Sequence, residues 1–123
     1  MKQLIVIAGP TASGKTDLAI ELALQLQTEI ISADSRQCYR EMNIGVAKPS
    51  SEQLATVPHH FINSHSIHDT VSAGTYERYA LSKLDELFAT HEQVIVTGGT
   101  GLYLKALMQG IDEMPEADPV ILQ

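Results

Sequence analysis

The sequence predicts an α/β fold in which a mostly parallel β-sheet is covered by helices on both faces. Strand-like and helix-like segments alternate along the 123 residues, the strand-like runs are short and continuously apolar, and glycine-containing turns follow two of them. Continuous apolar runs are typical of strands that are buried on both faces. Right-handed crossovers between such strands place the loops after them along one edge of the sheet, where ligands bind in open α/β folds.

The first half of the chain begins with a strand, a loop and a helix. We expect a strand over residues 3–8, "QLIVIA", because this run is apolar and β-branched. Leucines and alanines at helical spacing predict a helix over residues 16–27. A second strand is expected over residues 29–33, and a polar stretch extends from there to about residue 72.

The second half continues the alternation. We expect a long helix from about Gly74 to Ala89, a strand over residues 93–97, and a helix that begins near Thr100 and ends by Gly110. The tail "GIDEMPEADP" is rich in acids and prolines, so we interpret residues 111–123 as a linker or the boundary of a following insertion. A chain of 123 residues can build one core but is short for a doubly wound enzyme, so we expect one incomplete domain.

The turn after the first strand, "GPTASGKT", fits the pattern G-x-x-x-x-G-K-[S/T]. This pattern indicates phosphate binding when a strand precedes it and a helix follows, as expected here. We therefore predict a P-loop NTPase-like core, in which backbone N–H groups and the helix N-terminus hold an anion. Lys15 would reach terminal phosphate oxygens, and the Thr16 hydroxyl would bind Mg²⁺, the expected cofactor. The phosphate-binding residues would be Gly9, Pro10, Thr11, Ala12, Ser13, Gly14, Lys15 and Thr16.

A second block, "SADSRQCYR", begins where the second strand ends. Its Asp34 lies just past an apolar strand, beside the expected phosphate site. A carboxylate there could bind Mg²⁺ through water or act as a general base. Asp34 or Ser35 could equally cap a short turn that follows. The residues alone leave these roles open.

A third block, "VTGGTGLYLKAL", follows the third strand. Gly98 and Gly99 would allow a ligand to approach the backbone closely. Thr100 could cap the following helix or present its hydroxyl to the site. Tyr103 could face the cleft, but its helical spacing with Leu107 favours packing in the core.

The composition limits the class of protein. A net charge of −7 argues against nucleic-acid binding by the surface as a whole, although it allows a local basic groove. The sequence shows no membrane-spanning stretch and no secretory signal before the first strand. Cys38 is the single cysteine, which excludes an internal disulfide and suits a reducing compartment. We expect a cytoplasmic monomer without membrane contact.

Four segments together resemble one family. "GPTASGKT", "ISADSRQCYREMNIGVAKPS", "VPHHFI" and "VTGGTGLYLKALMQG" are similar, in content and in order, to the N-terminal part of the tRNA dimethylallyltransferase (tRNA isopentenyltransferase) family. The phosphate loop alone is generic. The blocks D-S-x-x-x-Y, x-G-x-A-K-P and G-G-T-x-L-Y are specific when they occur together.

The resemblance implies an activity and its residues. A dimethylallyl group would pass from dimethylallyl diphosphate to N6 of an adenosine beside the anticodon, so the partners would be that diphosphate and the anticodon stem-loop of a tRNA. The phosphate loop would hold the diphosphate, and the catalytic residues would be Asp34 as the base, Lys15 and Thr100. The residues implied to contact the tRNA are Asp34, Ser35, Arg36, Gln37, Lys48 and Thr100.

Some positions depart from the family pattern. Val46 stands where the family usually has Thr, Cys38 where it has Val or Ile, and Leu122 about where it has an Arg implicated in tRNA contact. The family's later segments, with a tRNA-clamping insertion and another catalytic arginine, lie beyond the match. We therefore expect residues 1–123 to be the N-terminal part of a longer transferase, with little or no activity alone.

Four histidines, His59, His60, His65 and His68, raise the question of a metal site. No acid or thiolate lies between them, and zinc ligands usually show tighter paired spacing. Because "VPHH" is one of the family blocks, a structural or tRNA-facing role is expected instead.

Two other functions remain open. A P-loop kinase for a small molecule or nucleotide would share the first strand, loop and helix, and could use Asp34 as a base toward a hydroxyl. That interpretation does not explain the G-G-T-x-L-Y block. A non-catalytic nucleotide-binding module would suit a short, acidic chain.

Overall fold

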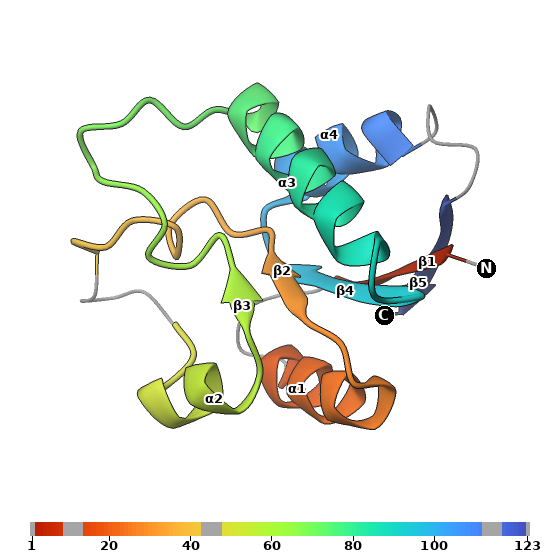
Figure 1. Ribbon diagram of the computed structural model, residues 1–123. Coiled ribbons are helices and arrows are strands. Elements are labelled where there is room, and N and C mark those ends of the chain that lie inside the picture. Colours follow the sequence, from red (N-terminus) through yellow and green to blue (C-terminus); the bar gives the residue numbers. More distant parts are fainter. Residues whose placement is uncertain (1, 9–13, 43–47, 112–116, 123) are drawn as a thin grey trace.

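A parallel five-stranded sheet forms the centre of the structure (Figure 1). The computed structural model describes residues 2–8, 14–42, 48–111 and 117–122. Neighbouring strands pair in parallel in the order β3-β2-β4-β1-β5. The strands are β1 (Lys2–Ala8), β2 (Ile30–Ser32), β3 (His59–His60), β4 (Gln93–Gly98) and β5 (Ala117–Leu122).

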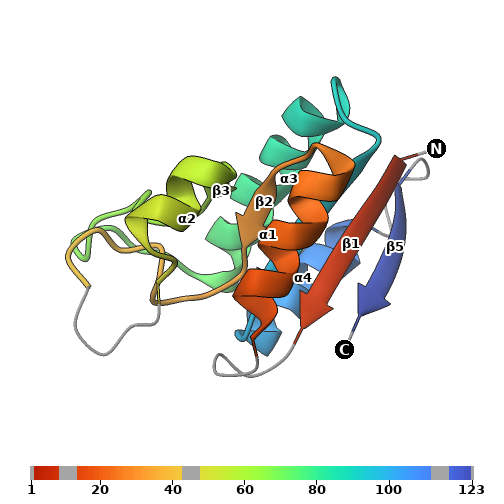
Figure 2. The same cartoon turned by 90° about the horizontal axis from the view of Figure 1, so that it is seen from below.

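Helices cover both faces of this sheet. Figures 1 and 2 show α1 and α2 on one face and α3 and α4 on the other. The Nε2 of Gln53 in α2 donates to Oδ1 of Asp17 in α1 at 3.0 Å, which joins the two helices on the first face. The helices are α1 (Lys15–Leu26), α2 (Ser51–Thr56), α3 (Ala73–Phe88) and α4 (Gly101–Ile111).

The central strand β1 contributes to a hydrophobic core on each face. Its Leu4 and Val6 pack with the buried residues of α3 and α4, whereas Ile5 and Ile7 pack with those of α1. Side chains alternate between the faces of a strand, so a strand that is covered on both faces must be apolar at consecutive positions. This explains the continuous run in the sequence and confirms the predicted fold class.

The interpretation of the tail as a linker was wrong for its last part, whereas the boundary of a following insertion stays a prediction. Residues Ala117–Leu122 form β5, which pairs with β1 from Lys2 to Ile7. The prolines and acids suggested an irregular segment, but an edge strand tolerates Pro119 because only one side of it must donate hydrogen bonds to a neighbour. Residues 117–122 form a strand because they pair with β1, which is far away in the sequence.

The polar stretch before residue 72 also contains secondary structure that the sequence did not predict. The short helix α2 begins with a capping box, in which the Ser50 Oγ accepts from the Gln53 N–H and the Gln53 side chain accepts from the Ser50 N–H. The short strand β3 then adds to the edge of the sheet beside β2. In the part of the chain that the structure describes, no helix has the length and apolar character needed to cross a membrane.

Candidate active site

The segments that follow β2 and β4 meet at the carboxyl edge of the sheet, and helix α1 begins at the same edge. The arrowhead of β1 and the first turn of α1 lie at the same end of the molecule in Figure 2. The Ala33 N–H, after β2, donates to the Thr97 carbonyl at 2.8 Å, and the Thr100 N–H donates back to the Ala33 carbonyl at 3.2 Å. The meeting of these segments at one edge is therefore as the sequence predicted.

Gly98 makes the contact between β4 and residue 33 possible. A Cβ atom at this position would lie 2.2 Å from the Ala33 carbonyl oxygen, far inside van der Waals contact. The sequence suggested that this glycine admits a ligand, but the neighbour that fills the space is the protein backbone. Gly98 therefore builds the edge on which the site lies.

Helix α1 begins directly from the expected phosphate loop. Its N-cap, Gly14, has φ 76°, a left-handed conformation that glycine adopts without steric cost. This turn directs the first N–H groups of the helix toward the carboxyl edge, where a helix N-terminus favours an anion. The predictions for the rest of the loop lie outside the described residues: Gly9, Pro10, Thr11, Ala12 and Ser13.

Lys15 and Asp34 interact across the edge. Lys15 is the first residue of α1 and is only 7% exposed. Burial lowers the pKa of Lys15, and the nearby Asp34 carboxylate opposes this effect by raising it. Thr16 follows in the same turn and is half-buried. The carboxyl edge therefore brings the Lys15 ammonium group, at the start of α1, near the Asp34 carboxylate, which follows β2.

Asp34 caps the turn that follows it through one oxygen. Its Oδ1 accepts hydrogen bonds from the N–H groups of Arg36 at 2.8 Å and Gln37 at 3.2 Å. This is the capping role that the sequence left open. Both of these hydrogen bonds go to Oδ1, so Oδ2 takes no part in the cap.

Thr100 joins the third segment to the second. Its Oγ1 accepts from the Ser35 N–H at 3.0 Å, and the two hydroxyl oxygens lie 3.4 Å apart. Its carbonyl accepts from the N–H groups of Tyr103 and Leu104, so Thr100 also stands at the start of α4. The Thr100 hydroxyl therefore contacts the loop that carries Asp34, while the Thr100 carbonyl begins the hydrogen bonding of α4. The contact with Thr100 holds Ser35, the residue next to Asp34.

The other residues predicted to contact tRNA differ in their exposure. Arg36 is exposed. Gln37 is 9% exposed, and its Oε1 accepts from the Ser32 hydroxyl at 3.1 Å. The Lys48 Nζ donates to the Tyr39 carbonyl at 2.7 Å and to Asn63 Oδ1 at 2.6 Å. Contact with tRNA stays a prediction for all of them.

Buried aromatic rings pack in one hydrophobic core with Ala33 and Cys38, the residues on either side of the turn that Asp34 caps. Tyr103 is 5% exposed and stacks on Tyr76 with 4.7 Å between ring centroids, which confirms the predicted packing role. Burial, aided by the nearby Cys38 and Asp34, raises the pKa of Tyr103 to about 12. Phe61 packs edge-on against Tyr76 at 4.9 Å and has φ 67°. Its contribution was missed because a positive φ in a bulky residue has no signal in the sequence.

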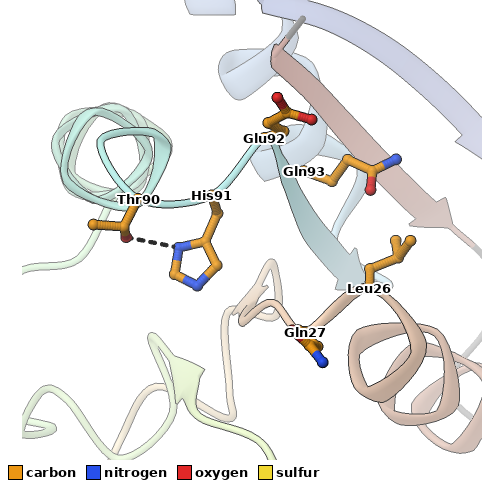
Figure 3. A pocket seen from close by; sticks show the side chains of 6 residues that line it. All are labelled: Leu26, Gln27, Thr90, His91, Glu92 and Gln93. Atoms are coloured by element: carbon orange, nitrogen blue, oxygen red, sulfur yellow. Dashed lines mark hydrogen bonds between the residues drawn. The ribbon is translucent and has the colours of Figure 1, made fainter.

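Two histidines lie close to the Glu29 carboxylate. The Nε2 of His60 lies 2.8 Å from Glu29 Oε1, and that of His91 lies 3.7 Å from Glu29 Oε2. Among the described residues, no three or more His, Cys, Asp or Glu side chains come together as a group that could hold a metal ion. His91 also lines a polar pocket of about 260 Å³ (Figure 3), at the amino ends of the strands and so opposite the carboxyl edge. The lining residues are Leu26, Gln27, Thr90, His91, Glu92 and Gln93.

Comparison with known proteins identifies the family. The model of the IPP transferase family matches residues 37–123. The chain belongs to the IPP transferase family. It is 52% identical over 118 residues to the tRNA dimethylallyltransferase of Cytophaga hutchinsonii, a match that covers 96% of this chain and 39% of that protein. The family resemblance that the sequence blocks indicated is confirmed.

Solved IPP transferase structures share this fold. The full-length tRNA isopentenylpyrophosphate transferase of Bacillus halodurans matches with a TM-score of 0.83 and 37% identity, over 89% of this chain and 36% of that one. A eukaryotic dimethylallyltransferase described as acting on tRNA matches with a TM-score of 0.81 and 32% identity, over 87% of this chain and 27% of that one. The chain therefore spans well under half the length of its relatives.

Proposed function

We propose that the protein carrying this chain transfers a dimethylallyl group from dimethylallyl diphosphate to N6 of an adenosine next to the anticodon of a tRNA. The observation that carries the proposal is the placement of Lys15 near Asp34 at the carboxyl edge of an IPP transferase. A cation there suits a departing diphosphate, and a carboxylate suits an amine that must lose a proton.

The diphosphate end of the reaction is assigned to the start of α1. As the allylic carbon–oxygen bond breaks, negative charge grows on the diphosphate. Lys15, the N–H groups after Gly14 and the positive end of the helix dipole stabilise that charge. Because Lys15 is buried, its field is weakly screened by water, which strengthens the effect.

The acceptor end is assigned to Asp34. An exocyclic amine of adenine is a poor nucleophile, so a base within hydrogen-bond reach assists it. N6 forms the new bond to the allylic carbon, the diphosphate leaves with the electron pair of the broken bond, and the proton of N6 passes to Asp34 Oδ2. Thr100 contributes by holding Ser35, and with it the turn that Asp34 caps.

Mg²⁺ suits the oxygen donors at this edge. The half-buried Thr16 hydroxyl follows Lys15, and Asp34 offers a carboxylate oxygen; hydroxyl and carboxylate oxygens are the ligands that Mg²⁺ prefers. We assign Thr16 as the protein ligand. When bound, the ion neutralises charge on the diphosphate.

The target base has to leave its stack to enter such a site, which a single-stranded anticodon loop allows at low cost. The exposure of Arg36, two residues after Asp34, supports a contact with the tRNA backbone. We infer a cytoplasmic location because a tRNA substrate and the buried free thiol of Cys38 both fit a reducing compartment. A monomer suffices, since the proposed groups come from one chain.

Calorimetry with the full-length protein tests the donor assignment. We expect dimethylallyl diphosphate to bind in the presence of Mg²⁺ and Lys15→Ala to abolish most of that binding. Tight ATP binding with transfer of its terminal phosphate to a small acceptor would establish a kinase instead.

A further inference from the structure

The loop that carries Asp34 is paired with a second segment of the chain. The Asn63 N–H donates to the Gln37 carbonyl at 3.0 Å, the His65 N–H donates to the Cys38 carbonyl at 2.9 Å, and the Arg40 N–H donates to the His65 carbonyl at 2.9 Å. We term these paired residues, 37–40 and 63–65, the loop ladder. It includes a parallel bridge between Tyr39 and His65.

Lys48 spans the loop ladder from one side to the other. Its Nζ donates to the Tyr39 carbonyl on the first segment at 2.7 Å and to Asn63 Oδ1 on the second at 2.6 Å. Both hydrogen bonds are short and charge-assisted, which makes them stronger than those between neutral groups. Asn63 has φ 55°, a left-handed backbone conformation that Asn adopts more readily than most residues.

The loop ladder continues directly into the turn that Asp34 caps. Gln37 donates its N–H to Asp34 Oδ1 and accepts from Asn63 through its carbonyl, so one residue belongs to both structures. The Tyr39 N–H donates back to the Arg36 carbonyl at 3.3 Å. A shift of Tyr39 would therefore move the backbone groups that orient the carboxylate.

We propose that Lys48 is a positioning residue, which clamps the loop ladder and thereby fixes Asp34 for the reaction, and that it does not bind a tRNA phosphate. To reach a phosphate, its ammonium group would have to release the Tyr39 carbonyl and Asn63. The catalytic consequence rests on the proposed function, whereas the clamp itself does not.

Hydrogen exchange tests the clamp without reference to activity. In Lys48→Met, the amides of Arg40 and His65 should exchange at least about tenfold faster, because the ladder opens more often. Asn63→Gly removes the uncharged acceptor and adopts φ 55° without strain, although it also loosens the backbone, and should have the same effect on these two amides. Unchanged exchange in either variant would overturn the clamp.

Kinetics on the full-length enzyme separate positioning from phosphate binding. Lys48→Met should lower kcat by about tenfold or more while KM for tRNA changes little, because misplacement of a catalytic group acts on the chemical step. Asn63→Gly should reproduce this loss, and the double variant should lose little more than either single variant. Lys83→Met, the same loss of charge on α3 in a surface pair with Glu86, is the matched control and should leave both constants unchanged.

The salt dependence of tRNA binding shows whether Lys48 contacts a phosphate instead of clamping the loop ladder. A lost phosphate contact reduces the slope of log K against log salt by about 0.7–0.9, whereas loss of the clamp leaves the slope as it is. A reduced slope with unchanged kcat in Lys48→Met would overturn the proposal. If wild-type enzyme shows no prenyl transfer at all, the proposed function fails, and hydrogen exchange still decides the clamp.

Discussion

Asp34 uses its two carboxyl oxygens differently. Oδ1 caps the following turn through Arg36 and Gln37, and Oδ2, which is not part of the cap, is the oxygen that we assign to the reaction. The hydrogen bonds to Oδ1 hold the Asp34 carboxylate in place while Oδ2 acts as the proposed base. The cap explains how a half-buried carboxylate at the end of a strand keeps one orientation.

Replacement of Asp34 by Asn separates these two roles. The amide side chain in Asp34→Asn keeps an oxygen acceptor for the cap but cannot take a proton. We expect donor binding to be nearly unchanged and kcat to fall by roughly 10²–10⁴, the usual range for loss of a general base. Calorimetry and single-turnover kinetics on the full-length enzyme measure the two quantities. Weaker binding of Mg²⁺ and diphosphate with an intact chemical step would instead identify a metal ligand.

At the scale of elements, the site depends on how closely β2 and β4 approach at their carboxyl ends. The Ala33 backbone lies against Gly98, and the hydrogen bonds of Ala33 to Thr97 and Thr100 follow from that contact. Thr100 then reaches Ser35 across the gap between the two segments. The geometry of the site therefore depends on the packing of β2 against β4, which is possible because Gly98 has no side chain.

A methyl group at Gly98 should disrupt this packing. Because its Cβ would lie 2.2 Å from the Ala33 oxygen, Gly98→Ala should lower the free energy of unfolding by about 3 kcal/mol or more. Gly101→Ala is the control, since a Cβ there meets nothing within 4 Å and lies in the first turn of α4. That variant should be neutral or stabilised by up to about 1 kcal/mol. Urea denaturation measures both, and equal stability of the two variants would contradict the packing argument.

The edge strand β3 should make stability depend on pH through His59. Burial is the main cause that lowers the pKa of His59, while its contact with the Val57 carbonyl raises it and His60 lowers it further. The unfolded chain therefore binds a proton more readily than the folded chain. The contribution of His59 to stability is complete above the unfolded pKa of about 6.5 and is lost as the pH falls through the lower folded value.

A matched pair of variants measures this contribution. His59→Asn keeps a donor for the Val57 carbonyl but does not titrate, so its stability should fall less than that of the wild type between about pH 7.5 and about pH 5.5. His68→Asn changes an exposed histidine and should follow the wild type. The observation that would contradict the assignment is an equal loss in wild type and His59→Asn by denaturant titration at both pH values.

At the scale of the whole molecule, acidity and the placement of cations limit nucleic-acid binding. The chain has a net charge of −7. Near the carboxyl edge, Lys15 is buried and Lys48 is engaged in the loop ladder, while Arg36 and Arg40 are exposed. A folded tRNA needs several phosphate contacts, and each adds to the salt dependence of binding.

We therefore expect residues 1–123 alone to bind an anticodon stem-loop weakly, with a Kd on the order of 10⁻⁴ M or higher at physiological salt. The slope of log K against log salt should be no steeper than about −2, because Arg36 and Arg40 are the exposed cations that the structure describes near this edge. Fluorescence anisotropy at two salt concentrations measures both values. Tight binding with a steep slope would mean that the nucleic-acid surface lies elsewhere on this chain.

The sequence alone determined the parallel α/β sheet with helices on both faces, the helix after the phosphate loop and the family. These features rest on local patterns: β1 is apolar at consecutive positions because both its faces are covered, and the specific blocks are short runs of neighbouring residues. It also indicated that Asp34 and Thr100 would lie at one edge, because the carboxyl ends of parallel strands coincide there.

Tertiary structure alone decided the remaining features. The strand β5 exists because β1 offers a partner more than a hundred residues earlier, and the loop ladder exists because residues 63–65 return to residues 37–40. The role of Gly98 depends on the backbone of Ala33, and that of Lys48 depends on Asn63. Hydrogen bonding and close packing between segments distant in the chain carry no local pattern, so residue propensities cannot reveal them.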